Sequence, residues 1–421
     1  MSRADKTNVN NLVDHLFRNE FGKMVSFLTH SYGIHFIDDA EDIAQDTLVS
    51  AFHNWSYNGI PDNPEGWIRR VANNKALNIL KKEQVRTRYA HGAKGHSSKS
   101  HSDDHNFLEE VQDSMLRMIL ACCDPSISSK SQIILVLSVL CGFSRKEIAN
   151  ALLDEEEAIK KRLFRAKKLL RENDFSPESL TGNELSPRLN VTYSCMYLLF
   201  NEGYNSSHHD DLIRKDLCLE AMRLTKLLVE RYPNDTSANA LLALMCFHVA
   251  RFDERIDNSG AIVLFKDQNR SNWNEELIRK GDYYLANSAV GNDLNAYHIE
   301  ASIAAIHCHA SSYEKTNWLF IKKLYERLYK IKPSPIIQLN LAIVESQLSG
   351  IDSGIEQLNK LAIKESKLQK YHLLYATLGE FYSQKNERDK AISNFETALS
   401  LTSSSKEELL LKNKIASLQR S

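Results

Sequence analysis

The chain has 421 residues, and 53 Lys and Arg residues against 54 Asp and Glu residues give it a formal net charge of −1. This balance excludes net charge as a guide to binding partners, and the length predicts roughly two to four domains. The seven cysteines, an odd number without the spacing of a disulfide framework, indicate a reduced cytoplasmic protein. The adjacent Cys122 and Cys123 are expected to be buried packing residues and not metal ligands.

No hydrophobic stretch reaches the length of a membrane span, and the polar first six residues do not resemble a signal peptide. We therefore expect no membrane partner. Glycine and proline are scarce, with 15 and 8 residues, and apolar side chains recur at intervals of three and four residues nearly throughout. Because this is the period of a helix face, the sequence predicts an all-α fold.

The first predicted helical unit covers residues 8–85, and an acidic helix is expected over residues 39–52. One face of this helix carries its acidic and amide side chains: Asp39, Glu41, Asp42, Gln45 and Asp46. The positions expected to point inward are Ile43, Thr47, Leu48 and Phe52. An acidic face suits a basic protein partner, although an acidic first turn also stabilises any helix.

A basic helix follows over residues 64–82. Between Trp67 and Lys99 the sequence has nine Lys or Arg residues and a single acidic residue, Glu83. Such a local positive stripe is typical of surfaces that follow nucleic-acid phosphates.

Residues 86–106 are predicted to form a flexible linker, because Ser, His, Lys and Gly dominate and apolar periodicity is lacking. The linker contains four regularly spaced histidines: His91, His96, His101 and His105. A solvated linker is preferred over a metal site, because no packed scaffold holds these side chains.

The second predicted unit, residues 107–175, ends in two short helices. Ser144 and Glu147 have the spacing of a capping box at the start of the first helix. The acidic run from Asp154 to Glu157 caps the second helix at its positive end. Two helices joined by so short a turn predict a helix-turn-helix, whose second helix fits a major groove.

The second helix of this motif has an apolar and a basic face. Its expected buried stripe consists of Ile159, Leu163, Ala166 and Leu170. The side chains expected to project outward are Lys160, Lys161, Phe164, Arg165 and Lys168. These suit phosphates and base edges. The alternative is an ordinary solvated amphipathic helix, but the capped first helix and the tight turn favour DNA binding.

Residues 186–421 are predicted to form a tetratricopeptide-like helical solenoid. The pattern is followed by Tyr375, Leu378, Gly379, Tyr382, Ala391, Phe395 and Ala398, with Ser403 in place of the terminal proline. Stacked helix pairs of this kind form a curved solenoid with a concave face. Residues 258–274 interrupt the repeat. Their Asp267 and Arg270 suggest a site, but an ion-paired loop is the preferred interpretation.

Residues 8–171 resemble the sigma-70 family of RNA polymerase sigma factors, of the extracytoplasmic-function type that keeps only regions 2 and 4. The acidic helix is similar to the region 2.2 helix, which docks on the clamp helices of the polymerase largest subunit. The core-polymerase-binding residues implied by the resemblance are Asp39, Glu41, Asp42, Gln45 and Asp46.

By the same resemblance, the basic helix matches regions 2.3 and 2.4, which read and melt the promoter −10 element. The implied −10 contacts are Trp67, Arg69, Arg70, Asn74, Lys75, Asn78, Lys81 and Lys82. Asn74 and Asn78 match positions that contact the captured strand, whereas the Lys and Arg side chains are available for phosphates. For Trp67, a role at the melted junction and a place in the core both remain open.

Residues 116–170 resemble region 4, whose helix-turn-helix reads the −35 element. The implied −35 contacts are Arg145, Lys160, Lys161, Arg162, Phe164, Arg165 and Lys167. Lys160, Lys161 and Phe164 fall at base-contacting positions, whereas Arg145, Arg162 and Lys167 are assigned to phosphates.

The C-terminal extension, residues 186–421, indicates which subgroup of these sigma factors the chain resembles. Together with residues 122–125, the segment 197–204 looks like the group that carries a tetratricopeptide-like extension and is often encoded beside small YCII-like (DGPF) proteins. Asp124 stands where that group is expected to have histidine. We expect the extension to regulate the factor through contact with regions 2 and 4 or with a partner protein.

The resemblance predicts a promoter-specificity subunit, partnered by core RNA polymerase and promoter DNA, with no catalysis, cofactor or metal of its own. The alternative is a tetratricopeptide signalling regulator that binds duplex operators without polymerase. An enzyme is disfavoured, because no nucleophile–base pair, phosphate-cradling glycine loop or metal-ligand spacing occurs in the sequence. The two region 2 motifs, which an operator-binding regulator does not need, favour the sigma factor.

Overall fold

The computed structural model describes residues 20–90, 114–124, 126–152, 154–172, 182–205, 213–257, 260–291 and 294–420. Within these ranges the regular elements are helices, and the β-type pairing is confined to one isolated bridge between Ile256 and Ile262. The predicted all-α fold is therefore confirmed. The chain divides into two compact units. Unit 1 comprises the described residues up to Leu199 together with Leu219–Leu227, and unit 2 comprises Phe200–Cys218 and the residues from Leu228 onward.

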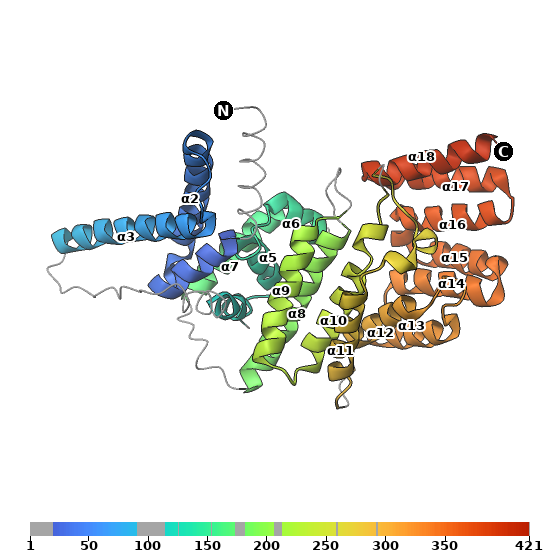
Figure 1. Cartoon of the computed structure of the whole chain (residues 1–421), viewed down its shortest axis with the longest axis horizontal. Helices are drawn as coiled ribbons and strands as arrows, with labels where there is room; N and C mark the ends of the chain where they lie inside the picture. Colours follow the sequence, from blue (N-terminus) through green and yellow to red (C-terminus); the bar gives the residue numbers. More distant parts are fainter. Residues whose placement is uncertain are drawn as a thin grey trace. The chain divides into compact units, whose positions relative to one another are not determined.

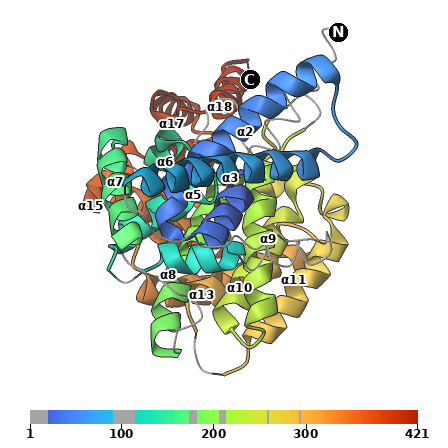
Figure 2. The same cartoon turned by 90° about the vertical axis from the view of Figure 1, so that its left-hand side faces the viewer.

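Unit 1 begins with a helix at residues 20–32, followed by η1 (Ile34–Phe36), α2 (Ile37–Asn58) and α3 (Pro64–Ala90). Helices α2 and α3 cross each other, as Figure 2 shows. Trp55 of α2 is fully buried and meets Trp67 of α3 edge to face, with 5.5 Å between the ring centroids. Such an aromatic pair stabilises the contact beyond the apolar area that it buries.

Helix α3 continues through Ala90, past the predicted boundary at residue 85. The segment has neither glycine nor proline before Gly92, and Lys, Arg and Gln favour helix. The remainder of the predicted linker, with its four histidines, lies outside the described residues.

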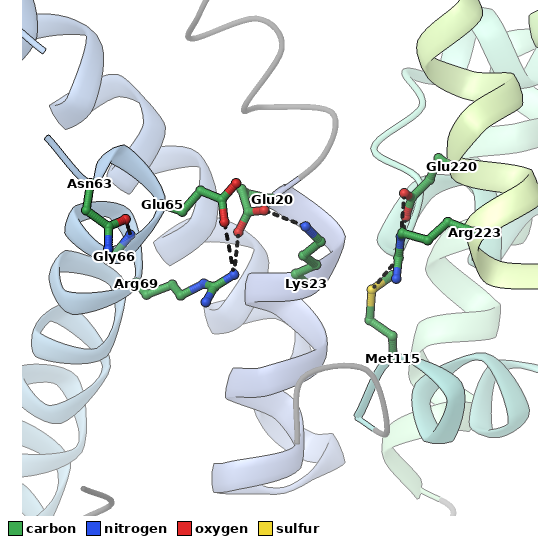
Figure 3. A network of polar contacts seen from close by, with 9 residues as sticks. All are labelled: Glu20, Lys23, Asn63, Glu65, Gly66, Arg69, Met115, Glu220 and Arg223. Atoms are coloured by element: carbon green, nitrogen blue, oxygen red, sulfur yellow. Dashed lines mark hydrogen bonds and ion pairs between the residues drawn. The ribbon is translucent and has the colours of Figure 1, made fainter. Parts of the chain in front are cut away.

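The rest of unit 1 is built from a helix at residues 114–122, from α5 (Ser129–Val139), α6 (Arg145–Leu152) and α7 (Glu156–Glu172), and from parts of α8 (Gly182–Tyr204) and α9 (Lys215–Arg231). Cys122 and Cys123 are buried free thiols, as predicted. In α9, Arg223 donates to Glu220 Oε1 at 2.7 Å and approaches Met115 Sδ at 3.2 Å (Figure 3).

The first part of α8 packs on the helix at residues 114–122. Arg188 donates to Leu120 O and to Asp124 Oδ2, both at 2.8 Å, and is itself buried. Burial acts to raise the pKa of Asp124, but its hydrogen bonds with Ser126 and Arg188 outweigh burial and lower it. Asp124, which stands where the resembling group is expected to have histidine, thus serves as the ion-pair partner of the buried Arg188. The second predicted unit consequently depends on a residue beyond its expected end at 175.

Unit 2 is a succession of helices that follow one another in chain order (Figure 1). After the remaining parts of α8 and α9 it contains α10 (Thr236–Val249), α11 (Glu275–Ser288), α12 (Ala296–His309), α13 (Trp318–Ile331), α14 (Pro335–Ser349), α15 (Ile351–Lys364), α16 (His372–Gln384), α17 (Arg388–Leu401) and α18 (Ser405–Arg420). The cores between neighbouring helices are continuous, since Phe381 packs with α14 and α15 while Tyr375 and Tyr382 also pack with α17. This arrangement agrees with the predicted solenoid.

A long connection between α10 and α11 contains three short 3-10 helices, η3 (Phe252–Glu254), η4 (Phe265–Asp267) and η5 (Arg270–Asn272). Lys266 of this connection pairs with Glu380 of α16, which also accepts from Lys414 of α18 at 2.6 Å. Burial alone would raise the pKa of Glu380, but the two ammonium groups lower it to about 2. Glu380 thus holds together three segments that are distant in the sequence.

Gly379 permits the close approach of α16 and α17, because a Cβ atom there would lie 2.6 Å from Cδ1 of the buried Phe395. We expect Gly379→Ala to overpack this contact and to lower the free energy of unfolding by about 1–3 kcal/mol. Leu373→Ala, at an exposed position of the same helix, should change it by less than about 0.5 kcal/mol. Urea denaturation of both variants makes the comparison, and equal stabilities would contradict the assignment.

Candidate nucleic-acid interface

Helix α2 presents an exposed stripe of mixed character. Asp42, Gln45 and Asp46 are exposed, and Val49 and Phe52 continue the stripe with exposed fractions of 55 % and 37 %. The prediction that Phe52 points inward is therefore wrong. The buried side of α2 continues through Ala51 to Trp55, which leaves Phe52 on the outer side. The surface combines carboxylates with apolar side chains, which suits a protein partner.

The other two predicted positions of α2, Asp39 and Glu41, are only partly accessible. Glu41 forms an ion pair with Lys167 of α7, and Asp38 pairs with Arg171 of α7 and lies 3.4 Å from Lys167. Burial raises the pKa of Glu41, although Lys167 opposes this effect. Asp39 is half-buried. The structure thus divides the five predicted polymerase-binding residues into an exposed set of three and a less accessible pair.

Helix α3 places its predicted residues on two sides. The exposed ones are Arg70, Asn74, Asn78, Lys81 and Lys82, which follow one side of the helix. The opposite side buries Ile68, Ala72 and Ala76. Amide groups flanked by cations on one exposed side of a helix can contact bases and phosphates together.

The remaining predicted residues of α3 face the protein. Arg69 lies 3.5 Å from both Glu20 and Glu65 (Figure 3), and Lys75 donates to Ser50 Oγ at 3.0 Å. Burial lowers the pKa of Lys75 although Asp46 opposes it. Trp67 is half-buried against Trp55. These three side chains hold the helices together, and the partners Glu20 and Ser50 were not identified from the sequence.

The helix-turn-helix has the capping predicted for it. Ser144 N donates to Glu147 Oε2 at 2.9 Å, and Glu147 N donates to Ser144 Oγ at 3.2 Å, which completes a capping box at α6. At the start of α7, Glu155 N donates to Asp154 Oδ1 at 3.0 Å. Arg145 is exposed beside the box.

Helix α7 exposes all five side chains that were expected to project outward: Lys160, Lys161, Phe164, Arg165 and Lys168. Phe164 has an exposed fraction of 68 %, which is unusual for an aromatic side chain without a partner surface. Ile159, Ala166 and Leu170 are buried, whereas Leu163 is half-buried. Arg162 pairs with Asp154, and Lys167 is engaged with α2. The structure therefore separates these two cations from the exposed set.

Comparison with known proteins gives the N-terminal part of the chain a family. Residues 20–86 match the family described as Sigma-70 region 2. The chain carries a sigma-70 region 2 domain. This domain contains the helix at residues 20–32, α2 and most of α3, so the acidic stripe and the amide and basic side of α3 both belong to it. A region 2 domain supports membership of the sigma-70 family.

The other comparisons describe the rest of the chain without assigning it a role. Residues 188–289 match a family of unknown function (DUF6596). An uncharacterized protein of Rhizobium meliloti (strain 1021) is 28 % identical over 379 residues, which cover 89 % of each chain. Anaphase-promoting complex subunit 8 of Dictyostelium discoideum is 26 % identical over 201 residues, which cover 42 % of this chain and 29 % of that protein. No helix in the described ranges combines the length and apolar character needed to cross a bilayer.

Asp154 provides a pH-dependent test of the region around α7. Hydrogen bonds from Lys130, Glu155 N and Arg162 lower the pKa of Asp154 from its ordinary 3.8 to about 2. Since the pKa is lowered in the folded state, the stabilisation is present above the unfolded pKa and is lost as the pH falls through the folded pKa. We expect wild type to exceed Asp154→Asn in stability above pH 4, with the difference shrinking towards pH 2. Urea denaturation across this range measures it.

Glu155→Gln is the matched control for the Asp154 variant, because Glu155 is exposed on the same turn. Its stability difference from wild type should show no comparable decline with acid. A pH-independent difference for Asp154→Asn would contradict the role assigned to this carboxylate.

Proposed function

We propose that this protein is a sigma factor of the extracytoplasmic-function type, which binds core RNA polymerase and directs promoter-specific transcription initiation in the cytoplasm. The region 2 match over residues 20–86 is the observation that carries the proposal. It is supported by the exposed face of α2, which offers a protein surface, and by the exposed amide and basic side of α3, which offers a nucleic-acid surface. The catalytic chemistry of transcription belongs to the polymerase.

The polymerase-binding surface is assigned to the exposed stripe of α2, with the clamp helices of the largest subunit as its partner. Asp42, Gln45 and Asp46 supply charge and hydrogen bonding, while Val49 and Phe52 supply apolar contact. Charge complementarity steers the encounter, and burial of the apolar side chains slows dissociation. Glu41 joins this surface only if its ion pair with Lys167 opens.

Reversing both exposed charges, Asp42→Lys with Asp46→Lys, should abolish co-purification with core polymerase, because like charges would then face a basic partner. The matched control is Asp62→Lys with Glu172→Lys, which changes the net charge equally at two exposed positions. The control should co-purify normally. Pull-down with core polymerase makes the measurement, and normal binding by a folded Asp42/Asp46 variant would refute the assignment.

The −10 element is assigned to the exposed side of α3. Asn74 and Asn78 would hold unstacked bases, while Arg70, Lys81 and Lys82 would contact the backbone. Arg69, Lys75 and Trp67 would instead maintain the shape of this surface, because each of them contacts a neighbouring part of the protein.

Asn74→Ala with Asn78→Ala should leave promoter association largely intact but reduce the permanganate reactivity of the melted thymines, since the extruded bases lose their amide partners. Asn54→Ala, an exposed asparagine of α2, is the control and should melt DNA normally. Unchanged reactivity in the Asn74/Asn78 variant would count against both assignments.

The −35 element is assigned to α7, which would lie in the major groove as the second helix of region 4. Lys160, Lys161, Phe164 and Arg165 are exposed and would contact bases and the adjacent phosphates, with Arg145 adding a phosphate contact from α6. Arg162 and Lys167 are less available, because each of them already pairs with a carboxylate.

The extension in unit 2 is proposed to be tetratricopeptide-like and to regulate the factor, through regions 2 and 4 or through a protein partner. The alternative reading, an operator-binding regulator that acts without polymerase, gives no role to the region 2 domain. Run-off transcription with core polymerase distinguishes the two. The full chain should support initiation and the Asp42/Asp46 variant should not. A truncation near residue 175 is unsuitable, because it removes Arg188, the buried partner of Leu120 and Asp124.

A further inference from the structure

A cluster of arginine and aromatic side chains lies in unit 2, where the connection after α10 meets the ends of α8 and α12. We name it the arginine–aromatic cluster and define it by six residues: Tyr204, Arg251, Arg255, Phe265, Arg270 and Trp273. The Arg251 guanidinium lies 4.5 Å from the Phe265 ring centroid, and that of Arg270 lies 5.1 Å from the Trp273 centroid. Arg255 lies 3.9 Å from the Tyr204 ring centroid. Three cations therefore share one set of rings.

Most of the hydrogen bonds in the cluster go to neutral oxygen atoms. Arg255 donates to the carbonyl oxygen of Tyr204 and, at 2.8 Å, to Asn205 Oδ1. Arg270 donates to His307 O at 2.6 Å and to Ala310 O at 2.9 Å. The ion-paired loop expected for residues 258–274 is present in part, because Lys266 pairs with Glu380, whereas Arg270 forms no ion pair among the described residues.

The cluster lacks a carboxylate counter-ion within the described residues. None of its three arginines forms an ion pair there, whereas five other arginines do so: Arg69 with Glu20 and Glu65, Arg162 with Asp154, Arg171 with Asp38, Arg188 with Asp124, and Arg223 with Glu220. Glu314 acts on Arg270 only through space. The positive ends of these side chains are therefore not neutralised by neighbouring acids.

The electrostatics of the neighbourhood agree with an excess of positive charge. Burial lowers the pKa of Arg255 and of Arg270, and the charge of Arg251 lowers both further. Burial, together with Arg251 and Arg270, lowers the pKa of His307 to about 3, so this ring is neutral at physiological pH. The carbonyl ends of α8, α10 and α12 offset part of the charge, at about half a unit each. That offset is smaller than the combined charge of the three arginines.

Several donors of the cluster also lack acceptors. Arg251 Nε, Arg270 Nη2 and Trp273 Nε1 are buried nitrogen atoms without a hydrogen-bond partner. A buried donor that remains unpaired is costly, and a charged one more so. A ligand that consists only of acceptors and carries two negative charges would satisfy both deficits.

We propose that the arginine–aromatic cluster is a binding site for a tetrahedral oxyanion, the phosphate group of a small molecule or free inorganic phosphate. The guanidinium fork matches such an oxyanion with paired hydrogen bonds. A phosphate dianion compensates the charge of several arginines better than a single carboxylate does. The faces of Phe265 and Trp273 are already covered by guanidinium groups and cannot stack on a ring of the ligand. The site would therefore bind the phosphate group and make no stacking contact with the rest of the molecule.

The test uses the full chain titrated with inorganic phosphate, with sodium chloride holding the ionic strength constant. Thermal unfolding and tryptophan fluorescence are followed together, since Trp273 lies within the cluster. We expect a saturable rise in Tm and a saturable change in fluorescence at low millimolar phosphate. Sulfate should compete and acetate should not. Trp273→Phe should remove the fluorescence response and, because it also loses the indole donor, should move the rise in Tm to higher phosphate concentrations.

Arg251→Gln is the deciding variant. Among the described residues the Arg251 side chain makes a single hydrogen bond, to the Tyr204 side chain, so the protein should fold without it. The substitution should weaken phosphate binding by about tenfold or more. Arg251→Lys keeps the positive charge but loses the paired donors of the guanidinium group, so its affinity for phosphate should lie between those of wild type and Arg251→Gln. Arg327→Gln, at an exposed arginine of α13, is the control and should bind like wild type.

Phosphate and sulfate also stabilise proteins by exclusion from their surfaces, and this effect would be the same in every variant. An identical response in wild type and in Arg251→Gln would therefore overturn the proposal, as would a response to acetate equal to that to phosphate. A parallel titration with glycerol 3-phosphate identifies the source of the ligand. Binding indicates a phosphate monoester, and its failure while inorganic phosphate binds indicates the free ion. The inference concerns binding alone and does not depend on the proposed role in transcription.

Discussion

The packing of α2 against α3 is the contact on which both candidate surfaces of region 2 depend. Trp55 of α2 meets Trp67 of α3, and Ile68, Ala72 and Ala76 are the buried side of α3. Two residues along a helix correspond to about 200° of rotation. The buried series at 68, 72 and 76 therefore fixes the series at 70, 74 and 78 on the opposite, exposed side. Loss of the crossing would leave neither surface with a defined orientation.

The sequence contained enough to predict the fold class and the local signals of the helix-turn-helix. The capping box at Ser144 and the outward face of α7 both follow from spacing within a single helix, which is why both agree with the structure. Phe52 was misplaced because the apolar positions of α2 exceed what one buried stripe can hold. The buried stripe instead ends on Trp55, the larger side chain.

What the sequence could not provide is which charged side chains pair across the fold. Arg69 reaches Glu20, which precedes it by 49 residues, and Lys167 reaches Glu41, which precedes it by 126. Spacing along one helix carries no information about such partners. A basic residue counted as a DNA contact from its helix alone can therefore be occupied by the protein itself. The extension shows the converse case, because three arginines, of which only Arg270 was singled out in the sequence, converge without an ion-pair partner among the described residues.

Glu380 links α18 to the connection between α10 and α11. Lys266 comes from that connection and Lys414 from α18, and both ammonium groups bind the same carboxylate. Displacing Lys414 would leave Glu380 with one cation in a partly buried place, and the pKa of Glu380 would rise because burial would be opposed by Lys266 alone. Loss of α18 would therefore change the charge balance around Lys266, in a loop more than a hundred residues earlier than Glu380.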